Sequence, residues 1–321
     1  MSAFFKICLK TLLIVGLALA VFTGTVYAAF PEKPIAIIVG RSAGGGTDKV
    51  ARSFIPFLER HMGVPIIVKN MRGGGGRMAN RYFSKLQPDG YKLLMAVLPS
   101  DVTQQLLKKP DYDLRNFTPL YGVGGGDSNG LMVPYDSEIK TFKDLLEASQ
   151  KKQITLSVTA FGGNSWLLAE QLKQRAGLKY KPIPFDSGNE ATVAVVGKHV
   201  TAGIANSTNL PDMIRQKKVR SLGVAAGERL SYLPDTPTFK ELGYPTVRTV
   251  TRQVLVAPPG MSAEMQKLLA DFAAKAVSDP DFIKLAEKQK FSLGPMAPKE
   301  LREEIGDTFG SIAELLEKVK K

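Results

Sequence analysis

Two glycine-rich stretches of the sequence have the composition of an anion-binding loop. The first consists of Arg41, Ser42, Ala43, Gly44, Gly45, Gly46, Thr47 and Asp48. It separates an apolar run from an amphipathic run, so we expect it to join a strand to a helix. Glycines let the backbone approach a ligand, and the unpaired N–H groups of a helix start attract anions such as carboxylates. The alternative is an ordinary turn in which Thr47 or Asp48 caps the helix.

The second stretch has the same position between an apolar run and a helical run. It consists of Thr159, Ala160, Phe161, Gly162, Gly163, Asn164 and Ser165, followed by Trp166. Ligands of open α/β sheets bind at the carboxyl ends of the strands, so two such loops would face each other across a cleft. Each helix start contributes about 0.3 to 1 kcal/mol per negative charge when exposed, so an opposed pair suits a diacid. The Trp166 ring either stacks on the ligand or packs in the core.

The sequence offers little for catalysis or cofactor chemistry. The glycine run 73–76 contains one GxGxxA spacing, but Asp89 falls short of the ribose-binding position of a dinucleotide site, which favours a flexible turn. His61 and His199 are far apart and lack the spacing of known catalytic motifs. We therefore expect no catalytic residue, no cofactor and no metal site.

The N-terminal segment has the features of a secretory signal peptide. Lys6 and Lys10 precede an apolar run over residues 11–22, and small residues allow cleavage after Ala28. An uncleaved anchor is the alternative, but a spanning helix needs roughly 20 apolar residues. Cys8 is the only cysteine, so the mature chain has no disulfide, Cys–metal site or Cys nucleophile.

The net charge of +13 could indicate a nucleic-acid partner in a cytosolic protein. An exported protein meets no genome, and the positive charges are dispersed along the chain. We therefore expect no nucleic-acid partner, but a basic surface that favours anionic solutes.

Alternating strand and helix patterns predict an α/β fold with parallel sheets. The first βαβαβ unit has strands at residues 34–40, 66–70 and 91–97 and helices at 47–62 and 77–86. The second unit has strands at residues 154–158, 180–185 and 202–206 and helices at 165–176 and 189–196, with a further strand at 219–224. The 321 residues are also enough for about two domains of roughly 100 to 200 residues each.

The end of the chain is expected to return to the first unit. A strand at residues 254–257 and helices at 262–278, 280–290 and 298–320 would complete it. The predicted division is a first lobe of residues 29–125 plus 247–321 and a second lobe of residues 126–246. The glycine-rich run 122–130 would form the first crossing of a hinge, because glycine permits large backbone rotations.

Four segments give the chain a family resemblance over residues 30–321. They are PEKPI at 31–35, AGGGTD at 43–48, QPDGY at 87–91 and VAPPG at 256–260. With these segments the chain resembles the Bug-type solute receptors of tripartite tricarboxylate transporters. The resemblance implies a two-lobed type II periplasmic-binding-protein fold, each lobe a sheet flanked by helices with a hinge between them. It also implies a periplasmic monomer that closes on a small carboxylate and delivers it to the membrane permease subunits.

The resemblance also implies site residues. The backbone of residues 42–47 and the loop 159–165 would hold the carboxylate. The segment 183–188, which includes Asp186, would follow in the cleft, with Asn206 at a further strand end. Arg41 stands where the family more often has an aromatic or aliphatic residue, and would pair bidentately with a second carboxylate. Trp166 stands where a histidine is common, and would admit an aromatic acid. Arg252 is a further candidate near the returning strand.

Two other classes of function stay open at this point. A ligand-sensing receptor that partners a membrane sensor kinase would have the same fold and cleft. An exported α/β enzyme is disfavoured because the sequence offers no nucleophile–base pair.

Overall fold

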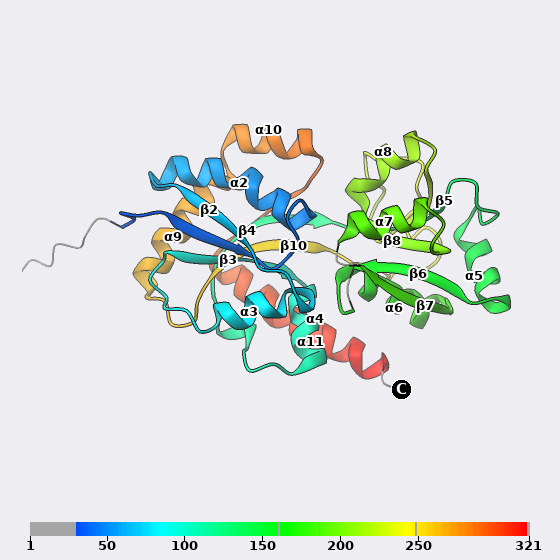
Figure 1. Ribbon diagram of the computed structural model, residues 1–321, viewed down its shortest axis with the longest axis horizontal. Coiled ribbons are helices and arrows are strands. Elements are labelled where there is room, and N and C mark those ends of the chain that lie inside the picture. The colour runs from blue at the N-terminus through cyan, green and yellow to red at the C-terminus, as the bar shows by residue number, and fades with distance from the viewer. Residues whose placement is uncertain (1–29, 160, 186, 248, 320–321) are drawn as a thin grey trace, which may run out of the picture. The chain divides into compact units, whose positions relative to one another are not determined.

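The computed structural model describes residues 30–159, 161–185, 187–247 and 249–319. The predicted signal peptide with Cys8 lies outside these residues, as do the predicted site residues Ala160 and Asp186. Residues Lys33–Lys321 form one compact unit. This unit is a two-lobed α/β structure with two mixed β-sheets, each flanked by helices (Figure 1).

The first sheet has the strand order β11-β4-β10-β3-β1-β2. Its strands are β1 (Ile35–Val39), β2 (Ile66–Asn70), β3 (Lys92–Leu98), β4 (Thr118–Asp127), β10 (Thr251–Ala257) and β11 (Leu293–Met296). Strand β1 pairs in parallel with β2 and β3, as expected of a βαβαβ unit. Strand β10 inserts antiparallel between β3 and β4, and β11 pairs antiparallel with β4. The sheet is therefore mixed, whereas the alternating pattern of strands and helices had predicted a parallel one.

Helices cover both faces of the first sheet (Figure 1). One face carries α2 (Gly46–Met62), α9 (Ala263–Val277) and α10 (Pro280–Gln289). The other carries α3 (Arg77–Phe83), α4 (Ser100–Lys108) and α11 (Pro298–Val319), with the short 3-10 helices η1 (Gly74–Gly76) and η2 (Leu114–Asn116) beside them. None of the described helices is both long and apolar enough to cross a membrane.

The second sheet has the strand order β7-β6-β8-β5-β9. Its strands are β5 (Asn129–Pro134), β6 (Ile154–Thr159), β7 (Tyr180–Phe185), β8 (Ala202–Asn206) and β9 (Val219–Val224). Strand β6 pairs in parallel with β7 and β8, while β5 is antiparallel to β8 and β9. The flanking helices are α5 (Phe142–Lys151), α6 (Asn164–Ala176), α7 (Gly188–Val196), η3 (Ser207–Asn209) and α8 (Leu210–Arg215).

The chain passes from the first sheet to the second at Ser128, between β4 and β5. The glycine-rich run predicted as a flexible crossing lies mostly inside β4, where it pairs with β10 and β11. Its glycines serve close packing: a Cβ at Gly124 would overlap the Gln253 side chain, and one at Gly125 would lie 3.3 Å from the Cα of Gly294.

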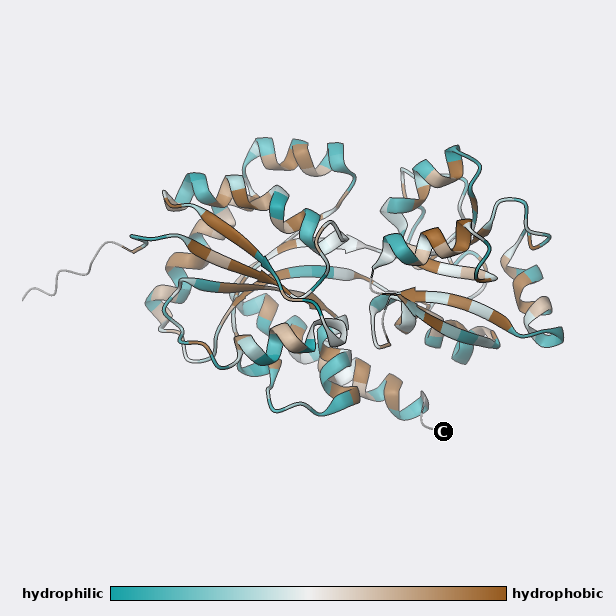
Figure 2. Cartoon of the chain, viewed as in Figure 1, coloured by the Kyte–Doolittle hydropathy of each residue, from teal (hydrophilic) through white to brown (hydrophobic). Residues whose placement is uncertain are grey.

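Hydrophobic side chains concentrate on the strands and on the helix faces that cover them (Figure 2). One buried cluster joins the α3, α4 and α11 side of the first sheet to the α5 and α6 side of the second. It includes Val102 and Phe309 from the first group of helices and Trp166 and Leu168 from the second. Shared apolar packing of this kind stabilises the contact between helices of the two sheets.

Candidate ligand-binding site

A cavity of about 150 Å³ lies where helices of both sheets begin. The first residues of four helices line it: Gly46 of α2, Ser100 of α4, Asn164 of α6 and Gly188 of α7. Pockets for drug-sized ligands are roughly 300 to 1,000 Å³, so this cavity suits a smaller solute.

Helices α2 and α6 begin with the same uncapped geometry. Their N-cap residues are Gly45 (φ −73°, ψ 168°) and Gly163 (φ −72°, ψ 167°), and no side chain accepts a hydrogen bond at either cap. The alternative in which Thr47 or Asp48 caps α2 is therefore wrong. The first N–H groups of a helix are satisfied by side chains, water or ligands, so the open starts of α2 and α6 leave donors and partial positive charge for an anion. Helix α4, which begins after Pro99, also has no side-chain cap.

Asp48 supports the first loop from behind and does not line the cavity. Its carboxylate accepts hydrogen bonds from Gly44 N (2.8 Å), Arg52 Nε (2.9 Å) and Asn70 Nδ2 (2.8 Å). Burial alone would raise the pKa of Asp48, but these hydrogen bonds and the charge of Arg52 outweigh it and lower the pKa below its ordinary value. Asp48 is thus held as a charged loop support.

The loop before α6 is closed by hydrogen bonds at its base. Ser165 Oγ accepts from Thr159 N at 2.7 Å and lies 2.8 Å from Thr159 Oγ1. At its tip, the Phe161 carbonyl accepts a hydrogen bond from Gln104 Nε2 of α4. Gly162 (φ +80°) also lies against α4, where a Cβ would come within 2.9 Å of Leu107. The tip therefore contacts the first lobe, and the described loop residues that line the cavity, Thr159, Asn164 and Ser165, lie at its base.

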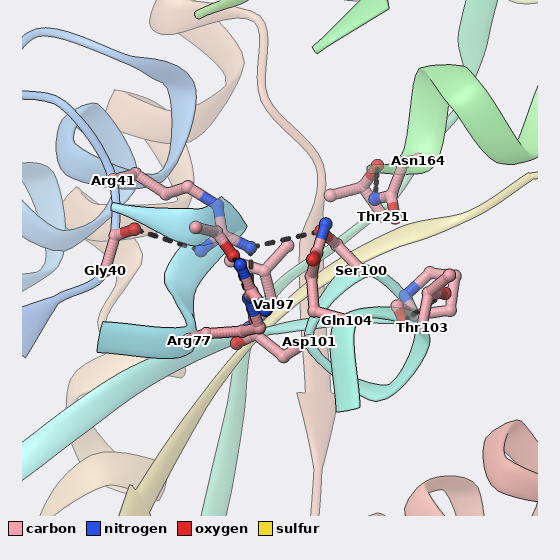
Figure 3. A network of polar contacts seen from close by, with 12 residues as sticks. Gly40, Arg41, Arg77, Val97, Ser100, Asp101, Thr103, Gln104, Asn164 and Thr251 are labelled. Atoms are coloured by element: carbon pink, nitrogen blue, oxygen red, sulfur yellow. Dashed lines mark hydrogen bonds and ion pairs between the residues drawn. The ribbon is translucent and has the colours of Figure 1, made fainter. Parts of the chain in front are cut away.

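Arg41 is the charged side chain among the described residues that line the cavity. It follows β1 and extends toward the start of α4 (Figure 3). Its Nη2 donates to Asp101 Oδ1 at 2.6 Å and to Ser100 Oγ at 3.2 Å, and its Nη1 donates to Gly40 O at 3.1 Å. The guanidinium thus already has a carboxylate partner inside the protein.

Trp166 and Arg252 point away from the cavity. Trp166 is buried in the apolar cluster between the helices, so the structure places its ring in the core. Arg252 forms an ion pair with Glu304 of α11 at 3.0 Å. Successive side chains of a strand alternate between its faces, so Thr251 and Gln253 of β10 line the cavity where Arg252 does not.

The structure brings part of the predicted site together. The predicted residues that line the cavity are Arg41, Ser42, Gly45, Gly46, Thr47, Thr159, Asn164, Ser165 and Asn206. The predicted residues that are described but do not line it are Ala43, Gly44, Asp48, Phe161, Gly162, Gly163 and Trp166. Ser187 and Gly188, from the cleft segment 183–188 that the resemblance implied, also line the cavity. The lining residues that sequence reasoning missed are Val97, Ser100, Asn129, Asn189, Ala205, Asn209, Thr251 and Gln253.

The missed residues had little local signal in the sequence. Their polar groups are mostly hydroxyls and amides, which orient a small polar ligand without adding charge. Among the described residues, no cluster of His, Cys, Asp and Glu could hold a metal ion. The two histidines, His61 at the end of α2 and His199 after α7, do not line the cavity. The arrangement is therefore suited to binding an anion at helix starts.

The chain is similar to several known proteins over most of its length. It is 31% identical over 258 residues to the Cupriavidus necator "UPF0065 protein in gbd 5'region", which covers 79% of this chain and 77% of the relative. The periplasmic binding protein BugD superposes with a TM-score of 0.83 at 26% identity, over 90% of this chain and 98% of BugD.

A third similarity concerns the fold alone. The Rhodopseudomonas palustris protein Rpa4515, whose structure was solved with adipate, has a TM-score of 0.83 at 21% identity, over 90% of this chain and 97% of that protein.

Residues 50–320 also match the family described as the tripartite tricarboxylate transporter family receptor, TctC. Because that match spans most of the chain and the fold agrees with BugD, the protein belongs to the TctC family of Bug-type solute-binding receptors.

Proposed function

We propose that the protein captures a small carboxylate in the cavity between its two lobes and delivers it to the permease subunits of a tripartite tricarboxylate transporter. The single observation that supports this most strongly is the pair of uncapped helix starts, α2 and α6, at one cavity. Family membership supports a solute-binding role, and the family and its structural neighbours are binding proteins.

The chemistry of the lining favours an acid over a cation. The described lining contains Arg41 and no acidic side chain, so its residues carry no charge that would attract a cationic solute. Exposed helix starts contribute about 0.3 to 1 kcal/mol per negative charge, and up to about 2 kcal/mol when partly buried. The adipate in the Rpa4515 structure is consistent with a carboxylate in a protein of this fold.

We further propose that capture involves closure of the two lobes. Residues 29–125 plus 247–321 would move as one lobe and residues 126–246 as the other. A ligand that contacts both lobes stabilises the closed form by its extra affinity for that form. The protein would act as a monomer in the periplasm, after cleavage of its signal peptide following Ala28. N-terminal sequencing of the exported protein would test the cleavage site.

The binding of an acid is best tested by thermal shift on the mature protein. The panel contains mono-, di- and tricarboxylates, aromatic acids and amino acids, with neutral and cationic solutes as controls. A ligand at 100 times its dissociation constant adds about 2.7 kcal/mol to the free energy of unfolding of the protein. The melting temperature of the protein should therefore rise clearly. If no acid raises the melting temperature while a neutral or cationic solute does, the carboxylate proposal is wrong.

A further inference from the structure

The Arg41 guanidinium is occupied on the side that a carboxylate would use. A guanidinium binds a carboxylate bidentately along either of two edges, Nε with Nη2 or Nη1 with Nη2. Both edges include Nη2. That nitrogen carries two hydrogens, and it has two acceptors inside the protein, Asp101 Oδ1 and Ser100 Oγ. Arg41 therefore cannot clamp a ligand carboxylate through two hydrogen bonds while these contacts hold.

Asp101 is itself fixed by its surroundings. Only 2% of it is exposed, and its second oxygen, Oδ2, accepts a hydrogen bond from Val97 N at 2.9 Å. The carboxylate thus uses one oxygen for the backbone of β3 and the other for Arg41 (Figure 3). Charge-assisted hydrogen bonds of this length are stronger than neutral ones, so the pair is a persistent feature of the cavity wall.

The glycine run 73–76 leaves room for this pair. At Gly76 (φ +99°) a Cβ would lie 2.7 Å from Asp101 Oδ1 and closer still to Arg41 Nη1. At Gly75 (φ +64°) a Cβ would lie 2.6 Å from Gln104 Nε2, one turn further along α4. The sequence indicated only a flexible turn here, but side chains at these two positions would displace the groups that hold Arg41 and Gln104.

We propose that Asp101 is a positioning residue that sets the charge selectivity of the cavity through Arg41. By holding Nη2, Asp101 keeps the guanidinium from clamping a ligand, and its own negative charge repels a second carboxylate at that end. Acids are then recognised at the helix starts, and a second carboxylate of the ligand does not form a bidentate contact with Arg41. This inference rests on the proposed function, because it concerns how the same cavity discriminates between acids that carry one and two negative charges.

The substitution Asp101→Asn tests the role of this carboxylate. An asparagine has one oxygen for two donors, and the buried Val97 N–H requires it, so the amide nitrogen would face Arg41. This frees the Nη2 hydrogen that Asp101 accepts, while Ser100 Oγ keeps the other. The measurement is isothermal titration of two matched pairs, butanoate with succinate and hexanoate with adipate. The diacid preference is the affinity for a diacid divided by the affinity for its monoacid partner. For the pair whose diacid binds better, we expect this preference to be about tenfold higher in Asp101→Asn than in the wild type.

Two further variants make the test specific. Asp101→Ser removes the same charge with a smaller side chain, so it should shift the diacid preference in the same direction if Asp101→Asn folds poorly. Asp111→Asn is the control, because Asp111 is an exposed carboxylate paired with Arg81 and Lys85 away from the cavity. It changes the net charge equally, and it should leave the diacid preference within threefold of the wild type.

The outcomes separate this inference from the function on which it rests. If the acids bind but removal of the Asp101 charge changes the diacid preference less than threefold, or reduces it, the positioning role is wrong while carboxylate binding stands. If Asp111→Asn raises the preference as much as Asp101→Asn, the effect is one of overall charge and the inference is also wrong. If neither acid of either pair binds the wild type, and no acid of the thermal-shift panel raises the melting temperature, the proposed function itself is wrong.

Discussion

The side-chain amide of Gln104 donates a hydrogen bond to the main-chain carbonyl of Phe161. Gln104 lies on α4, beside the first sheet, and Phe161 lies in the loop that leads from β6 of the second sheet into α6. The two residues are 57 positions apart in the sequence. Their contact joins the loop before α6 to helix α4, whose first residue, Ser100, lines the cavity.

Loss of this hydrogen bond should weaken ligand binding without unfolding the protein. Gln104→Met keeps a side chain of similar volume but removes the donor. A neutral hydrogen bond contributes about 0.5 to 1.5 kcal/mol, so we expect the affinity for a bound acid to fall roughly two- to twelvefold. Titration calorimetry measures this, and Gln150→Met is the control, since the Gln150 amide donates to the Gly177 carbonyl away from the cavity. Equal affinities of Gln104→Met and wild type would show that the contact does not support binding.

A negative charge at the start of α2 should block acid binding. Gly46 lines the cavity, and a Cβ built there meets no atom within 4 Å, so the backbone has room for a side chain to begin at this position, as in Gly46→Asp. An acidic residue in the first turn also stabilises a helix. We expect the affinity for acids to fall at least tenfold, because the new carboxylate competes with the ligand for the same N–H groups.

The matched control is Gly46→Asn, which has nearly the same size and no charge. Its affinity for acids should stay within about threefold of the wild type, since a tenfold change corresponds to about 1.4 kcal/mol. Circular dichroism and melting temperature would confirm that both variants are folded. If asparagine and aspartate weaken binding equally, the cause is steric and the helix start is not the anion site.

The Asp48 carboxylate should make stability depend on pH. Its pKa is lowered in the folded protein, so its contribution is complete above the unfolded value of about 3.9 and is lost as the pH falls toward the lower folded value. At neutral pH, Asp48→Asn should reduce the free energy of unfolding by about 1 to 3 kcal/mol, because charged hydrogen bonds to Gly44 and Arg52 are weakened. Below about pH 4 the difference from wild type should shrink.

Urea unfolding at a series of pH values measures this difference directly. The exposed Asp235 provides the control, and Asp235→Asn should remain within about 0.5 kcal/mol of the wild type, as surface substitutions usually do. A gap between Asp48→Asn and wild type that stays constant or grows on acidification would contradict the role given to Asp48.

Local patterns in the sequence determined most of the elements and the two glycine-rich loops. The predicted strands at 66–70, 180–185, 202–206 and 219–224 coincide with β2, β7, β8 and β9, and the Gly-rich stretches precede α2 and α6 as expected. These features depend on periodicity and on glycine at a strand-to-helix junction, both of which are local properties of the chain.

Tertiary structure alone decided which side chains face the cavity. The sequence singled out Arg252, but the register of β10 turns that arginine toward Glu304 and directs Thr251 and Gln253 to the site. The sequence also suggested that Arg41 would bind a carboxylate of the ligand. In the structure, α4 brings Asp101, 60 positions along the chain, against the Arg41 guanidinium. Strand register and helix packing are set by contacts between distant segments, so no local pattern could have predicted that the cavity's arginine already has a carboxylate partner.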